Sequence, residues 1–143
     1  MALHDAFWAL VGGSAPVIAL AAVVSKGELR SVKERYWDLL ADTLSGARLS
    51  DPAFENVNQQ MGRLNYANSA QNLNFLLQTG ALAFALLGID DPSRGAAYTQ
   101  PIAGTFVLLG MCALAYAGVV TSQALSVLAG FDRKHREGKS DNN

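Results

Sequence analysis

Charge is missing from the longest apolar part of this sequence, because residues 102–131 contain no Asp, Glu, Lys, Arg or His. Residues 6–25 and 73–89 lack the same five residue types, and charged residues make up only 16% of the chain. Soluble domains carry roughly 25%, and an uncharged, mostly apolar run of about 18 or more residues is typical of a transmembrane helix. The sequence therefore predicts an all-α integral membrane protein, with residues 1–143 forming a single membrane domain.

Several kinds of functional site are also missing. The one cysteine, Cys112, has no partner for an internal disulfide, and the two histidines, His4 and His135, lie near opposite ends of the chain. No Cys/His cluster has the spacing of metal ligands, and no basic run resembles a nucleic-acid-binding surface. No nucleophile–base pair, phosphate loop or pair of carboxylates stands out. We therefore expect no metal, no cofactor, no nucleic-acid partner and no enzymatic activity.

The uncharged stretches predict three transmembrane helices, at about 6–25, 73–89 and 102–125. The second is near the lower length limit of about 17 residues for a helix that crosses a bilayer. The third is expected to follow a turn at 90–95, where Asp, Pro, Ser and Gly are concentrated, and to begin near Pro101. None of the three contains the charged groups that ion-coupled transporters usually carry inside the membrane.

Polar segments separate and follow these predicted spans. Within residues 26–72, apolar side chains recur at helical spacing over about 28–44 and again over about 52–70. We expect these two helices to pack together as a cytoplasmic helical hairpin. Residues 132–143 are basic and polar, and we expect a flexible cytoplasmic tail there.

Lys and Arg are sorted by segment. Residues 26–72 hold six and residues 132–143 hold four of the eleven in the chain, and the other is Arg94. The positive-inside rule then places the N-terminus outside and the C-terminus in the cytoplasm, which predicts a multi-pass protein of the cell membrane. The positive residues follow the stretch 6–25, whereas a signal peptide carries them before its apolar core. We therefore expect residues 1–25 to be retained as the first span.

Small residues recur at every fourth position of the third apolar stretch, which puts them on one helix face. Such spacing lets two helices approach closely, so that dispersion forces and interhelical hydrogen bonds act between them. Two interpretations stay open, packing within the chain and an interface between copies. We call these residues the small-residue ridge, and they are Gly118, Ser122, Ser126 and Gly130, with Ala113 and Ala117 as a neighbouring pair.

Amide and hydroxyl side chains recur every seven residues through the second polar helix and into the second span. An amide in hydrocarbon costs several kcal/mol if it has no hydrogen-bond partner, so Gln78 and Thr79 are expected to face protein or water. Two interpretations stay open: hydrogen bonds between helices of one bundle, and a pore lining or a polar network between subunits. This amide stripe consists of Asn58, Asn65, Asn72 and Thr79, widened by Asn68, Gln71 and Gln78.

A helix-breaking combination, Gly12, Gly13 and Pro16, lies in the middle of the first span. Proline lacks a backbone N–H and its ring clashes with the preceding turn, so we expect a kinked helix that packs closely through its glycines. The alternative is a broken helix whose exposed backbone binds a ligand, as in some transporters.

The layout of three spans, an outside N-terminus and a basic cytoplasmic tail resembles that of the three-span phage holins, which form lesions in the cytoplasmic membrane. The connector 26–72 is longer here than in such holins. Asn68–Asn72 is similar to the Asn-x-x-Glu-Asn signature of glutathione-dependent membrane enzymes, with Gln71 in place of the glutamate, but the four-span layout of that family is missing. We expect a non-enzymatic protein that acts through helix–helix association in the lipid bilayer, as a homo-oligomer or as a subunit of a larger membrane complex. The alternative is a pore- or lesion-forming protein, holin-like or channel-like, with an amide-lined path.

Overall fold

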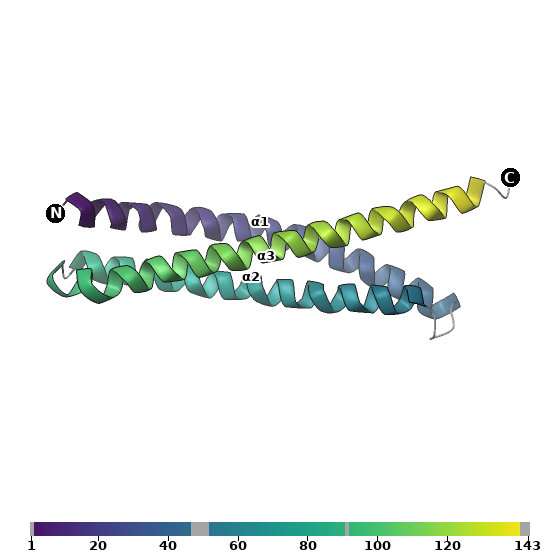
Figure 1. Ribbon diagram of the computed structural model, residues 1–143, viewed down its shortest axis with the longest axis horizontal. Helices are drawn as coiled ribbons and strands as arrows, with labels where there is room; N and C mark the ends of the chain where they lie inside the picture. The colour runs from purple at the N-terminus through teal and green to yellow at the C-terminus, as the bar shows by residue number, and fades with distance from the viewer. Residues whose placement is uncertain (1, 47–51, 91, 141–143) are drawn as a thin grey trace.

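The chain folds into three long helices that run side by side (Figure 1). The computed structural model describes the backbone of residues 2–46, 52–90 and 92–140 and the side chains of residues 5–41, 55–87 and 99–130. The helices are α1 (Ala2–Gly46), α2 (Pro52–Asp90) and α3 (Pro92–Ser140), and no strand occurs in these ranges. Each helix reverses the direction of the one before it, so the bundle has an up-down-up arrangement.

Each helix is longer than the elements that the sequence predicts. α1 joins the predicted helices 6–25 and 28–44 into one helix of 45 residues. α2 joins 52–70 and 73–89, as the lack of proline between residues 53 and 91 predicts. At 1.5 Å per residue α1 is roughly 68 Å long, about twice the thickness of a bilayer hydrocarbon core. The division between apolar and polar halves is therefore a change of composition along continuous helices and not a break in the backbone.

The third helix also differs from its predicted bounds. We expected a turn at 90–95 and a helix from 102, but α3 begins at Pro92, with Pro101 inside it. Proline is well tolerated at the first helical position, because the N–H it lacks would have no intrahelical acceptor there. At the other end α3 continues to Ser140, well into the segment predicted as a flexible tail, and residues 141–143 lie outside the described part.

α1 is continuous through Gly12, Gly13 and Pro16, where the sequence predicts a kink. The helix passes through Pro16 without a break. The Ser14 hydroxyl donates a hydrogen bond to the carbonyl of Val11, at 3.5 Å. A Cβ atom added at Gly12 or Gly13 would meet nothing within 4 Å, so these glycines are not points of close packing within the chain.

Two of the helices are long and apolar enough to cross a membrane, α1 over Asp5–Ala41 and α3 over Thr99–Gly130. Only 22% of the most apolar window of α1 and 17% of that of α3 is buried inside the bundle. The described residues of α2 do not reach the same apolar average. Most apolar side chains of α1 and α3 therefore face away from the protein.

The bundle core follows a seven-residue repeat along each helix, as in a coiled coil. Buried positions recur at this spacing on all three helices. On α3 they are small, which lets its backbone approach the other two helices closely. The buried series are Trp8, Ala15, Ala22, Leu29 and Tyr36 on α1, Val57, Leu64, Gln71, Gln78 and Ala85 on α2, and Ala103, Gly110, Ala117 and Ala124 on α3.

Two hydrophobic clusters lie along this core. One, near the start of α1, contains Trp8 and Val11 with Ala81, Ala85 and Ala103. The other fills the polar half and contains residues of all three helices, among them Leu29, Tyr36, Leu64, Val120 and Leu128. The predicted hairpin of 28–44 and 52–70 is thus completed by the C-terminal half of α3 as a three-helix bundle.

Candidate functional site

Three amide side chains of α2 occupy the core between the two hydrophobic clusters. Gln71, Asn74 and Gln78 are 1%, 0% and 1% exposed, and they continue the buried seam of α2. Along α2, one cluster ends at Ala67 and the other begins at Ala81. We call these three residues the amide layer.

The amide layer is only partly hydrogen-bonded. The Gln71 Nε2 atom donates to the Ser25 hydroxyl of α1, at 2.8 Å, and the Gln78 Nε2 atom donates to the Asn74 Oδ1 atom, at 3.1 Å. Three buried atoms of the layer have no protein partner, namely Gln71 Oε1, Asn74 Nδ2 and Gln78 Oε1. A buried polar group without a partner lowers the free energy of unfolding by about 1–3 kcal/mol. The amide layer therefore contains polar atoms that could still form hydrogen bonds.

Gly110 of α3 lies directly against the layer. A Cβ atom at this position would overlap the side-chain amides of Gln78 and Asn74. Any residue larger than glycine would force these two amides to move, because they fill the space in which its side chain would begin. At this position α2 and α3 are therefore in close contact. The hydrogen bond between Gln71 and Ser25 joins α2 to α1 nearby.

The amide stripe predicted from the sequence lies mostly outside this core. Asn65, Asn72 and Thr79 are exposed and Asn68 is partly buried, whereas Gln78 is buried. Gln71 and Gln78 precede Asn72 and Thr79 by one residue, and one residue turns a helix by about 100°. The structure therefore does not bring the predicted set together. Exposed Asn72 accepts a hydrogen bond from Lys26 Nζ, at 2.8 Å, and Thr79 donates to the carbonyl of Phe75, at 2.9 Å.

Asn74 is the member of the layer that sequence reasoning missed. The signal that could have found it is the apolar seam of α2, Val57, Met61 and Leu64, continued in steps of three and four residues. Continued from Ala67, that seam reaches Gln71 and then Asn74. Asn74 was missed because helical spacing was followed there only through apolar side chains.

The small-residue ridge lies on the outside of the bundle. Gly118, Ser122, Ser126 and Gly130 are all exposed, and a Cβ added at Gly118 or Gly130 would meet nothing within 4 Å. Its neighbour Ala117 is buried and Ala113 is partly buried. Close packing within the chain therefore uses the buried series that includes Gly110 and Ala117, and no helix covers the ridge among the residues whose side chains are described.

No known protein family, curated protein or solved structure matches this chain. The function must therefore be inferred from the amide layer, the small-residue ridge and the exposed apolar side chains. Among the described side chains, no group of three or more His, Cys, Asp or Glu residues could hold a metal ion.

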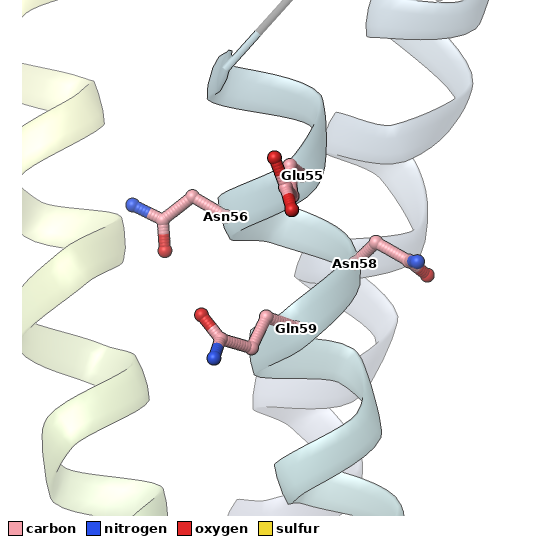
Figure 2. A pocket seen from close by; sticks show the side chains of 4 residues that line it. All are labelled: Glu55, Asn56, Asn58 and Gln59. Atoms are coloured by element: carbon pink, nitrogen blue, oxygen red, sulfur yellow. The ribbon is translucent and has the colours of Figure 1, made fainter.

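A surface hollow of about 450 Å³ lies beside the first turns of α2, lined by Glu55, Asn56, Asn58 and Gln59. Figure 2 shows Asn56 and Gln59 pointing to the side of α2 that faces α3, and Asn58 pointing to the opposite side. Because these side chains diverge around one helix, they do not converge on a ligand, and we assign no site there.

The half of the bundle that contains residues 28–44 and 52–70 has charged side chains, and we call it the charged half. One of its polar contacts joins two helices and another lies within α1. Arg63 Nη2 of α2 donates to the Oε1 atom of Gln123 on α3, at 2.6 Å. Arg30 and Glu34 of α1 form an ion pair at 3.0 Å, with side chains 82% and 65% exposed. An exposed pair of this kind contributes little to stability.

Proposed function

We propose that this chain is an integral membrane protein with three spans, its N-terminus outside and its C-terminus in the cytoplasm of the cell. The supporting observation is a band of exposed, large apolar side chains on all three helices. Soluble monomers rarely expose apolar patches of this extent, whereas lipid covers them at no cost. The band contains Leu10, Val17, Leu20, Val23 and Val24 of α1, Leu73, Leu76, Leu86 and Leu87 of α2, and Ile102, Leu108, Leu109 and Met111 of α3.

The amide layer explains how α2 can serve as a span although its average composition is less apolar. Gln71, Asn74 and Gln78 lower that average, but they face the bundle interior and not the lipid. Outward positions of the same segment, such as Leu76 and Leu86, are 72% and 69% exposed. A helix that is polar inside and apolar outside fits a membrane bundle, because polar groups within spans face protein or water.

The protein acts through helix–helix association, as a homo-oligomer or as a subunit of a larger membrane complex, along a surface of α3 that runs from its apolar part into the polar half of the bundle. The small-residue ridge carries this proposal, because it is exposed along α3 and no other part of the described chain covers it. Small residues let a second helix approach until backbone atoms make contact, and serine hydroxyls can hydrogen-bond across such an interface. The activity is non-enzymatic.

The test is the oligomeric mass of the purified protein in detergent, measured by light scattering. Gly118→Leu and Ser122→Leu add bulk to the ridge and should shift the mass toward that of the monomer. Ala21→Leu is the matched control, because Ala21 is an exposed small residue on α1, and this variant should keep the mass of the original protein. An unchanged mass in both ridge variants would contradict association through the ridge.

A second candidate is a pore- or lesion-forming protein, favoured by exposed polar groups of α2 that extend from the charged half to the level of the apolar band. The exposed Asn65, Asn72 and Thr79 could meet only between copies, so a pore lined by them requires an oligomer. Induced expression in bacteria, with a voltage-sensitive dye, tests this candidate. Depolarisation that is lost in Thr79→Val favours a pore between copies, and a steady potential with correctly inserted protein excludes it.

A further inference from the structure

We propose that the amide layer is an internal water-binding site, in which ordered water molecules complete the hydrogen bonds of Gln71, Asn74 and Gln78. The inference begins with three buried polar atoms that have no partner in the described chain, two amide oxygens and one amide nitrogen. Their side chains are 0–1% exposed. Neither lipid headgroups nor a second copy of the chain can therefore reach them from outside.

The chemistry of the three atoms selects a small neutral ligand. Gln71 Oε1 and Gln78 Oε1 need hydrogen-bond donors, and Asn74 Nδ2 needs an acceptor. A cation would suit the two oxygens but would be repelled by the N–H groups of Asn74. An anion would suit those N–H groups but would be repelled by the two oxygens. Water both donates and accepts, and buried waters typically make about three hydrogen bonds to otherwise unpaired groups.

The packing also limits the size of the ligand. The amides of Asn74 and Gln78 already lie against the backbone of Gly110, in the space where a side chain would begin. A larger hydroxyl or amide compound would have to separate α2 from α3. A water molecule needs about 10–15 Å³ of accessible space, which is the smallest demand of any ligand with the required donors and acceptors.

The amide layer adjoins the charged half of the bundle. Gln71 is bonded to Ser25, which directly precedes Lys26, and Lys26 is bonded to exposed Asn72. The layer thus begins at the level where charged, water-facing side chains end and continues toward the apolar cluster of Trp8 and Ala81. Because the site lies within one chain, it does not depend on association through the small-residue ridge.

Water-edited solid-state NMR on the full-length protein in lipid bilayers tests the proposal. Magnetisation is transferred from water to the side-chain amide nitrogens, with exposed Asn72 as the positive control. We expect transfer to Asn74 and Gln78 as well as to Asn72. Transfer to Asn72 alone, or to Asn72 and Gln71 alone, would overturn the site, since the deeper amides would then be dry.

A variant tests whether the transfer to Asn74 comes from water bound in the layer or from proton exchange between neighbouring side chains. Gln78→Met keeps similar volume but removes one of the two unpartnered oxygens, so transfer to Asn74 should fall while transfer to Asn72 is unchanged. Unchanged transfer to Asn74 in this variant would overturn the role of Gln78. If the variant does not fold, the measurement on the original protein still decides the proposal. The mass of the ridge variants is independent of both results.

Discussion

The hydroxyl of Tyr36 on α1 donates a hydrogen bond to the backbone carbonyl of Ala124 on α3, at 3.1 Å, and the Tyr36 side chain is 0% exposed. A helical carbonyl normally accepts only from its own helix, but its second lone pair remains available. The bond thus joins the first and third helices of the bundle at a defined level. It lies in the polar half, beyond the apolar stretch 6–25.

Removing this hydroxyl should weaken the polar half of the bundle. Tyr36→Phe keeps the ring and loses one buried hydrogen bond, which is worth about 1 kcal/mol. Tyr66→Phe is the control, because Tyr66 is 72% exposed, and it should have almost no effect. The free energy of unfolding in mild detergent, from denaturant titration, measures both. Equal losses in the two variants would show that the Tyr36–Ala124 bond is not a stabilising contact.

Alkaline pH should destabilise the protein partly through Tyr36. Burial raises the pKa of the Tyr36 phenol above its ordinary value of 10.0. The folded state therefore keeps the proton to higher pH than the unfolded state, so the contribution is fully present below the unfolded pKa and falls as pH rises through the folded pKa. Stability measured at neutral pH and at about pH 11 should show a smaller loss for Tyr36→Phe than for the original protein.

Two glycines of α3 should respond in opposite ways to alanine. Gly110→Ala places a methyl group against Asn74 and Gln78 and should destabilise the fold by about 1–3 kcal/mol, the usual cost of overpacking. Gly118→Ala adds a methyl group in open space and should stabilise the helix by up to about 1 kcal/mol. Unfolding in detergent distinguishes them. Similar values for the two variants would mean that α3 does not approach α2 at Gly110.

Gly80 offers a test of the contact between α2 and α3 nearer their connection. A Cβ at Gly80 would lie 2.8 Å from the edge of the Phe106 ring, which also stacks edge-on against Phe84 at 5.7 Å. Gly80→Ala should therefore destabilise the fold, and Phe106→Leu should reduce that cost by making room. A double-mutant cycle measures the coupling. Additive effects would show that the two positions do not touch.

The orientation in the membrane can be tested with cysteines in a Cys112→Ser background. Asp5→Cys should react from outside the cell with a membrane-impermeant thiol reagent, and Ser31→Cys should react only after the membrane is permeabilised. This follows from the sorting of Lys and Arg into 26–72 and 132–143. Reaction of Ser31→Cys in intact cells, without reaction of Asp5→Cys, would reverse the orientation.

Much of the helical architecture could be predicted from composition and spacing. The apolar stretches 6–25 and 102–125 lie in the two helices that are long and apolar enough to cross a membrane, and the spacing of Leu29, Val32 and Tyr36 marked a buried face. The residues at which the helices begin and end were less predictable. Pro92 and Pro101 suggested a loop, but Pro92 is the first residue of α3, where proline is well tolerated, and the helix continues through Pro101.

By itself, the sequence determined which segments are helical and apolar, because hydropathy and period are properties of consecutive residues. On the polar part of α2, the tertiary structure decided which of two polar faces is inside. On α2, the series Asn65, Asn72 and Thr79 and the series Leu64, Gln71 and Gln78 have the same seven-residue period but lie about 100° apart. The second series is buried because Ser25 of α1 and Gly110 of α3 meet it there. Those partners are far away in the sequence, and within α2 only the continuation of the apolar series Val57, Met61 and Leu64 points to the buried face.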